Sequence, residues 1–262
     1  MKIGLVQATA CEAVSENFKT LANFVRETAE AGCEAVCFPE CFLTGYVPKK
    51  AEELAIPADS PVLRQVSDLA ISSGVDILAG FMEKGEAGCF ITHGIFRRDG
   101  SRDRYRKSHL GSRERLYFLP GDALDVFTLS NGLRIGIQLC VETHYPEITQ
   151  TYALRSAEVV FAPHAVPRVS GDRKKIWGKY IFARSYDNRV YMACCNLWDP
   201  DRFGGGCLVT DPRGEETAAY YGEEAHLLAW EVDREALAQY RTPGHKRAVH
   251  YYPEKRRREL YE

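Results

Sequence analysis

Short apolar runs recur along the chain and alternate with segments whose apolar residues follow helical spacing. The runs fall at residues 3–6, 35–38, 75–81, 89–96, 133–139, 159–162, 190–195, 207–210 and 227–232. A short apolar run bounded by turn residues is typical of a strand that is buried on both faces. We therefore predict strands at these positions, packed in the interior of the protein.

Helices are predicted between several of these strands. Leu21, Phe24, Val25 and Thr28 recur at helical spacing, and Gly32 marks the end of that helix. Further helical patterns cover residues 62–71, 145–155 and 174–187. Strands that alternate with helices predict an α/β layered fold.

The chain is predicted to form a single domain over residues 1–262, because it shows no internal repeat and no long linker. Residues 242–262 are rich in Arg, Lys and Tyr and lack apolar periodicity. We expect this C-terminal tail to lie at a subunit interface, where Tyr251, Tyr252 and Tyr261 would supply aromatic contacts.

Composition narrows the classes of partner. The net charge is −2, which gives no general attraction to nucleic acid or to an acidic membrane. No run of 18 apolar residues is present, so no membrane span is predicted. The nine cysteines form an odd set without an export signal, which favours reduced thiols in the cytoplasm.

Three polar residues stand near the ends of predicted strands. Glu40 and Cys140 each follow a strand closely, and Lys107 follows the strand ending near Phe96 after a short basic connection. Sites in α/β sheets gather at the carboxyl ends of strands. Taken singly, the three would be an ordinary turn carboxylate, a surface charge and a small core thiol.

Their order and flanking residues make the combination specific. The segments are Phe38-Pro39-Glu40, Lys107-Ser108-His109-Leu110, and Leu139-Cys140 with Pro146-Glu147 downstream. On these motifs the sequence resembles the nitrilase superfamily of carbon–nitrogen hydrolases, from Met1 to about Thr210. The resemblance implies a four-layer α-β-β-α sandwich and a catalytic triad of Glu40, Lys107 and Cys140.

The resemblance also implies supporting roles. Glu114 would orient Lys107 or the substrate, and the Val141 N–H would join Lys107 in binding an oxyanion. It implies a homodimer or a higher homo-oligomer. The residues after Cys140 line the pocket in this superfamily, so Glu142 and His144, together with His164, are expected to contact substrate.

The chemistry of carbon–nitrogen hydrolysis suits these residue types. A thiolate is the strongest common nucleophile near neutral pH, and Glu40 could remove the proton of Cys140. Because the triad supplies nucleophile, base and positive charge, we predict no metal and no cofactor. We expect that loss of Glu40 would slow alkylation of Cys140 by reducing the thiolate fraction.

The substrate is predicted to be a small amide or N-carbamoyl compound. True nitrilases commonly carry Trp-Glu after the cysteine, whereas this chain has Val141-Glu142, and its length resembles the amidase and carbamoylase branches. A nitrile stays open as an alternative. Basic residues near a predicted loop could favour a substrate carboxylate, although a solvent-facing loop accounts for them equally: Arg168, Arg173, Lys174 and Lys175.

Other functions are weighed against this one. Cys140 and His144 could form a thiol hydrolase pair if a helix began at the cysteine. A non-catalytic binding protein on the same fold is a second alternative. Cys33, Cys37 and Cys41 faintly suggest an iron–sulfur loop, but they flank a predicted strand and lack a C-x₂-C spacing.

Overall fold

The computed structural model of the protein describes residues 1–248 and 256–260. Its strands form two large sheets and one small sheet. The first sheet contains β1 (Lys2–Gln7), β2 (Ala35–Cys37), β3 (Ile56–Pro57), β4 (Asp76–Lys84), β5 (Cys89–Phe96), β6 (Arg102–Arg106) and β15 (His226–Glu231). The second contains β7 (Phe127–Thr128), β8 (Arg134–Ile137), β9 (Val159–His164), β10 (Tyr191–Asn196), β13 (Cys207–Thr210) and β14 (Glu216–Tyr220), and β11 (Trp198–Asp199) pairs with β12 (Phe203–Gly204).

Each large sheet has a parallel centre and antiparallel edges. In the first sheet the order is β15-β1-β2-β4-β5-β6, with β1, β2 and β4 parallel. In the second the order is β14-β13-β10-β9-β8-β7, with β8, β9 and β10 parallel. The apolar runs predict all of the parallel strands, because a strand covered on both faces has no polar side, and they also predict the antiparallel strands β5, β13 and β15.

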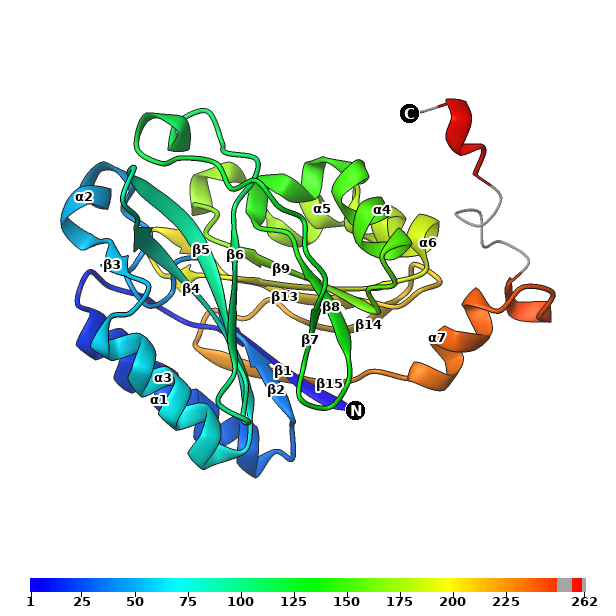
Figure 1. Ribbon diagram of the computed structural model, residues 1–262, viewed down its shortest axis with the longest axis horizontal. Coiled ribbons are helices and arrows are strands. Elements are labelled where there is room, and N and C mark those ends of the chain that lie inside the picture. The colour runs from blue at the N-terminus through cyan, green and yellow to red at the C-terminus, as the bar shows by residue number, and fades with distance from the viewer. Residues whose placement is uncertain (249–255, 261–262) are drawn as a thin grey trace.

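Helices cover the outer face of each sheet. They are α1 (Val14–Glu30), α3 (Pro61–Ser73), α4 (Pro146–Leu154), α5 (Arg173–Trp177) and α6 (Ile181–Asn188). Two more helices, α2 (Ala51–Leu54) and α7 (Arg234–Arg241), instead contribute Ala51 and Leu237 to the layer between the sheets. Helices α1 and α3 lie side by side outside the first sheet, and α4, α5 and α6 lie outside the second (Figure 1). No helix within residues 1–248 and 256–260 is long and apolar enough to cross a membrane.

Three apolar layers hold this arrangement together. The central layer joins the inner faces of the two sheets, for example Leu5 and Leu78 with Ile137 and Phe161. The second layer packs α1 and α3 on the first sheet, and the third packs α4, α5 and α6 on the second. The layers therefore follow the order helix, sheet, sheet, helix (Figure 1).

The structure differs from the sequence-based expectation in two elements near the site. The helix predicted over residues 174–187 is two helices, α5 and α6, separated at Gly178–Tyr180 where the backbone of Tyr180 leaves helical geometry with φ −144°. The basic connection before Lys107 is an edge strand, β6, in which only Tyr105 is buried. The three tyrosines of the tail, Tyr251, Tyr252 and Tyr261, lie outside the described residues.

The strand directions bring the predicted catalytic residues to one end of the sandwich. Strand β6 runs antiparallel to β5, and β5 runs antiparallel to β4, so β2, β4 and β6 all point the same way. Glu40 follows β2 and Lys107 follows β6, while Cys140 follows β8 in the second sheet.

Candidate active site

Glu40 lies in a tight turn directly after β2. The next residue, Cys41, adopts a left-handed backbone with φ 54°. Gly80 of β4 lets this turn approach the sheet, since a Cβ there would lie 2.9 Å from the carbonyl oxygen of Pro39. The Glu40 carboxylate is buried, with Oε1 bound by Lys107 and Oε2 without a hydrogen-bond partner.

Lys107 is a buried cation between two carboxylates. Its Nζ donates to Glu40 Oε1 at 2.7 Å and to Glu114 Oε1 at 2.8 Å. Its backbone is fixed on both sides, with the N–H donating to Ile91 O and the carbonyl accepting from the N–H of Gly121, both at 2.8 Å. The ammonium is therefore held in one place before substrate arrives.

Glu114 is anchored by three separate donors. Besides Lys107, the hydroxyl of Tyr46 donates to Oε1 at 2.9 Å and the N–H of Gly111 donates to Oε2 at 2.6 Å. Both oxygens are thus engaged, whereas Glu40 keeps one oxygen free. The two carboxylates on the same ammonium are therefore suited to different tasks: Glu114 to holding Lys107, and Glu40 to exchanging a proton.

Cys140 begins the short 3₁₀ turn η3 (Cys140–His144), which follows β8 after Gln138 and Leu139. Its backbone is left-handed, with φ 48°, an unusual conformation for a residue with a side chain. The residue as a whole is half-buried, and its thiol interacts electrostatically with both Glu40 and Lys107. Burial and the neighbouring Glu40 charge raise the pKa of the Cys140 thiol to about 12, so the resting side chain is the protonated thiol.

Burial also dominates the protonation of Glu40. It raises the pKa of the Glu40 carboxyl to about 7, against the opposing effect of the Lys107 ammonium. The pKa of Lys107 is raised despite its burial, because two carboxylates and the Cys140 thiol surround it. Glu40 is therefore poised to gain or lose a proton near neutral pH, while Lys107 stays charged.

Glu142 joins the loop carrying Lys107 to the turn carrying Cys140. Its Oε1 accepts from the Tyr105 hydroxyl at 2.7 Å, from Ser108 N at 2.8 Å and from His109 N at 3.1 Å. Its Oε2 accepts from Leu139 N at 2.7 Å. Because both oxygens are occupied and the side chain is fully buried, these contacts make Glu142 a positioning residue and not a wall of the pocket.

The two histidines expected at the pocket lie in different surroundings. The ring of His144 is exposed and packs on Tyr180, with ring centroids 4.5 Å apart. His164 is buried; its Nδ1 donates to Ala162 O at 2.7 Å and its Nε2 accepts from the Trp177 indole at 3.3 Å. Burial lowers the pKa of His164 to about 3, so it is a neutral support behind the site.

The four basic residues near the predicted loop separate into two kinds. Lys175 is 82% exposed, and Arg168 pairs with the exposed Glu223 at 3.2 Å. Lys174 lies over the ring of Tyr221 at 5.8 Å. Arg173, in contrast, is 8% exposed and interacts electrostatically with Cys140.

A family comparison fits this geometry. The sequence matches the family model for carbon-nitrogen hydrolase over residues 2–242. The chain belongs to the carbon–nitrogen hydrolase family. The predicted membership and the enzyme class, a carbon–nitrogen hydrolase, are thereby confirmed.

Similar curated proteins include amidases and a nitrilase. The chain is 28% identical to the omega-amidase NIT2 of Homo sapiens over 257 residues, covering 92% of this chain and 91% of that protein. It is 27% identical to a nitrilase of Pyrococcus abyssi over 236 residues, covering 83% of this chain and 84% of that protein.

Solved structures support the fold. An amidase from Nesterenkonia sp. superposes with a TM-score of 0.85 at 24% identity, covering 99% of this chain and 94% of that one. The same amidase has been solved as a Cys-to-Ala mutant in complex with butyramide, and as a Glu-to-Gln mutant with acrylamide added to its active-site cysteine. The four-layer sandwich predicted for this hydrolase is confirmed.

The structure gives no support to the two other sites considered from the sequence, a Cys140–His144 pair and an iron–sulfur loop. Among residues 1–248 and 256–260, no hydrogen bond joins His144 to Cys140. Within the same described ranges, no group of three or more His, Cys, Asp or Glu side chains is placed to hold a metal ion. Cys37 and Cys41 lie in the central apolar layer, and Cys33 is buried nearby at the end of α1.

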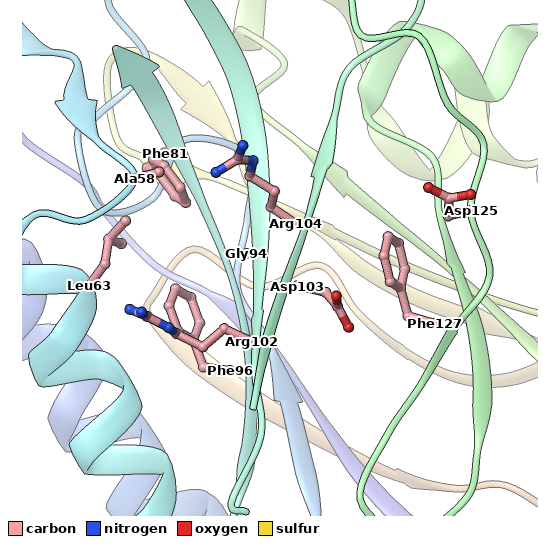
Figure 2. Close-up of a pocket in the computed structure, with 10 residues that line it drawn as sticks. All are labelled: Ala58, Leu63, Phe81, Gly94, Phe96, Arg102, Asp103, Arg104, Asp125 and Phe127. Carbon is pink, nitrogen blue, oxygen red and sulfur yellow. The ribbon is translucent and has the colours of Figure 1, made fainter. Parts of the chain in front are cut away.

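A separate hollow lies along β6, the edge strand of the first sheet, and no triad residue lines it. Its volume is about 410 Å³, and its lining includes Leu63, Phe81, Phe96, Arg102 and Arg104. Figure 2 shows Arg102 extending from β6 toward the helix that carries Leu63, and Arg104 extending from β6 toward Phe81. Neither Glu40, Lys107 nor Cys140 lines this hollow, so it is not the place where the chemistry occurs.

Three supporting residues escaped the sequence analysis. Tyr46 holds Glu114, and Tyr105 holds Glu142. Gln138 donates to the carbonyl of Glu142 at 2.6 Å and so fixes the turn after the nucleophile. Tyr105 and Gln138 each stand two residues before a catalytic candidate, which is the only local signal that could have found them.

Proposed function

We propose that this hydrolase cleaves a small-molecule amide through a thioester on Cys140, with Glu40 as proton carrier and Lys107 as the positive charge of the site. The observation that carries the proposal is the division between the two oxygens of Glu40. Oε1 is fixed by Lys107, and the buried Oε2 is free to take a proton. A base held at one atom and open at the other suits transfer between a nearby thiol and a leaving amine.

The first half of the reaction forms the thioester. Sγ of Cys140 attacks the carbonyl carbon while its proton passes to Glu40 Oε2. The carbonyl oxygen becomes an oxyanion, which Lys107 and the N–H of Val141 would bind. Donors arranged in advance for such a charge are worth about 3–4 kcal/mol each. The C–N bond then breaks as Glu40 returns the proton to the departing nitrogen, which leaves as ammonia or an amine.

The second half releases the acid. Water enters, Glu40 Oε2 removes one of its protons, and the oxygen attacks the thioester carbon. The same oxyanion donors serve this step, because the geometry at carbon is the same. The C–S bond breaks, the thiolate recovers the proton from Glu40, and the carboxylic acid leaves. No step requires a group outside the triad and the Val141 N–H.

The preference for amides over nitriles and N-carbamoyl compounds is part of this proposal. It is supported by the resemblance of the chain to an omega-amidase and to a Nesterenkonia amidase, although a nitrilase is also among its relatives. The test is a matched panel, butyramide, N-carbamoyl-β-alanine and butyronitrile, scored by ammonia release. We expect butyramide to be hydrolysed fastest. Turnover of the nitrile alone would assign the chain to the alternative activity.

We further propose that the enzyme acts in the cytoplasm as a homodimer or a larger homo-oligomer. All nine cysteines are free, which suits a reducing compartment. No role for nucleic acid or for a membrane is proposed, since the net charge is only −2. The proposed partner is a small-molecule amide, and no metal or cofactor is required.

A further inference from the structure

The peptide group between Cys140 and Val141 takes part in the proposed reaction through its N–H, which is the Val141 donor to the oxyanion. The carbonyl of the same group belongs to the nucleophile. A peptide group is planar and trans, so its N–H and its C=O point in opposite directions. Any contact that fixes the Cys140 carbonyl oxygen therefore also fixes the direction of the Val141 N–H.

Thr143 holds this carbonyl oxygen. Its Oγ1 donates to Cys140 O at 2.6 Å, and the side chain is fully buried. A 3₁₀ turn brings the N–H of residue i+3 against the carbonyl of residue i, so the backbone of Thr143 faces the same oxygen. Within the described part of the chain, no other side chain donates to Cys140 O. The left-handed backbone of Cys140, with φ 48°, is a conformation that persists only where its surroundings hold it.

The other polar side chains of this turn hold different atoms. Glu142 accepts from Leu139 N, before the nucleophile, and Gln138 donates to Glu142 O, after it. The Val141 N–H donates to no protein acceptor among the described residues, which leaves it available to a substrate oxygen. Thr143 is therefore the side chain that acts on the peptide group carrying this donor.

The threonine hydroxyl has a second neighbour in the helical layer of the second sheet. Its oxygen lies 3.3 Å from the hydroxyl oxygen of Tyr180, the residue before α6. A hydroxyl has one proton to donate, and the contact with Cys140 O is the shorter, so that bond holds the proton. Hydrogen bonds in series polarise one another, so a carbonyl that accepts this bond makes the N–H of its own peptide group a stronger donor.

We propose that Thr143 is a positioning residue that aims the Val141 N–H at the substrate oxyanion by holding the Cys140 carbonyl. This inference rests on the proposed amide hydrolysis and deepens it. The oxyanion develops only on the way to the tetrahedral intermediate, so a misdirected donor should lower kcat and leave KM nearly unchanged. Alkylation by iodoacetamide displaces iodide from a saturated carbon and forms no oxyanion, so its rate should not depend on Thr143.

The test uses Thr143→Val, which keeps the shape of the side chain and removes the hydroxyl. We expect kcat for butyramide to fall about 10- to 100-fold, less than the loss of a whole oxyanion donor, with KM within about twofold. Thr143→Ser should recover most of the loss. Thr28→Val is the matched control and should keep full activity, because Thr28 is equally buried and donates to the backbone carbonyl of Phe24 at 2.6 Å in α1.

A second measurement does not depend on turnover. Butyraldehyde should protect Cys140 from iodoacetamide, because the thiol adds to the aldehyde carbon. The S–C bond forms, the C=O π bond breaks, and the thiol proton passes through Glu40 to the oxygen, which occupies the oxyanion site. Thr143→Val should need about 10-fold more aldehyde for half protection, whereas its alkylation without aldehyde should stay within about twofold of wild type.

The possible results separate this inference from the proposed function. Alkylation of Thr143→Val that slows in proportion to turnover would show that Thr143 places the thiol, and would overturn the inference. Unchanged kcat with unchanged aldehyde protection, or an equal loss in Thr28→Val, would also overturn it. If Thr143→Val does not fold, Thr143→Ala and Thr143→Ser make the same comparison. If wild type does not hydrolyse butyramide, the proposed function fails, and the aldehyde measurement still decides the role of Thr143.

Discussion

The two carboxylates that share Lys107 show how one residue type takes two roles. Glu114 is held by donors on both oxygens, and Glu40 keeps Oε2 free. The sequence identified Glu40, Lys107 and Cys140 because their motifs are local and ordered along the chain. It could not distinguish Arg173 from Lys174 and Lys175, since their difference in burial depends on packing between α5 and the turn after β8.

Replacing Glu40 should separate turnover from thiol reactivity. Glu40→Gln removes the base, so amide hydrolysis should fall at least about 1,000-fold. The charge of Glu40 raises the pKa of Cys140, so its removal should leave alkylation by iodoacetamide as fast as in wild type or faster. The expectation from the sequence, slower alkylation through loss of the base, stays untested, and the measured rate decides between the two outcomes.

The control for that experiment is Cys140→Ala, which should lose both hydrolysis and labelling of the peptide that carries residue 140. Rapid acid quench of wild type with a good amide should give a mass adduct on the same peptide. An adduct on Cys41, Cys194 or Cys207 would contradict the assignment of the nucleophile.

The pH dependence should follow the raised pKa of Glu40. As the base of the free enzyme, Glu40 must be ionised, so kcat/KM should fall as the pH drops through about 7. Titration of Glu40 does not cause this fall in activity by unfolding the protein. The folded pKa of this group lies above the usual value of 4.5, so its contribution to stability is complete below pH 4.5 and is lost as the pH rises through about 7. A pH profile of kcat/KM alongside tryptophan fluorescence tests both statements, and a flat profile between pH 5 and 8 would contradict the role of Glu40.

At the scale of elements, the sequence predicted the apolar strands and missed the polar strands at the sheet edges. The parallel strands β1, β2, β8, β9 and β10 are apolar because they are covered on both faces. Edge strand β6 resembles a basic connection because four of its five residues are charged, and β14, an edge strand of the second sheet, has no fully buried residue. The break between α5 and α6 was also missed, because the apolar spacing continues through Gly178 and the change at Tyr180 is in the backbone.

Glu142, which connects the loop after β6 to the turn after β8, should contribute strongly to stability. Glu142→Gln removes the charge that receives donors from the β6 loop and from Leu139. We expect it to lower the free energy of unfolding by about 2–4 kcal/mol, because buried donors lose their acceptor. Urea unfolding measures this loss. Glu147→Gln, an exposed substitution in α4, is the control, and equal stability of the two variants would show that this connection is dispensable.

At the scale of the whole molecule, the sandwich was predictable and the assembly was not. The alternation of elements and the motifs together specify two sheets with helices outside. Contacts between subunits leave no comparable periodic signal, since an interface is decided by a few exposed side chains. The tail's role at such an interface therefore stays a prediction from composition.

The oligomeric state can be measured directly. Sedimentation at micromolar concentration should give at least a dimer. A chain truncated before Thr242 should dissociate toward the monomer if the tail contributes to the interface. A monomer in the first experiment would remove the proposal of an oligomer, and an intact oligomer in the second would remove the role of the tail.

The different exposure of the cysteines allows the active sites of the enzyme to be counted by thiol titration. Cys11 is exposed and Cys140 is partly accessible, whereas the other seven cysteines are buried. Cys11 should therefore react first with a chromogenic disulfide reagent under native conditions, and Cys140 should follow more slowly because its resting thiol is protonated. Cys11→Ser should release only the slower equivalent. The colour released by that variant would count competent nucleophiles in moles, so that turnover numbers could be referred to functional sites instead of total protein. A third equivalent would mean that the interior opens on the time scale of the assay.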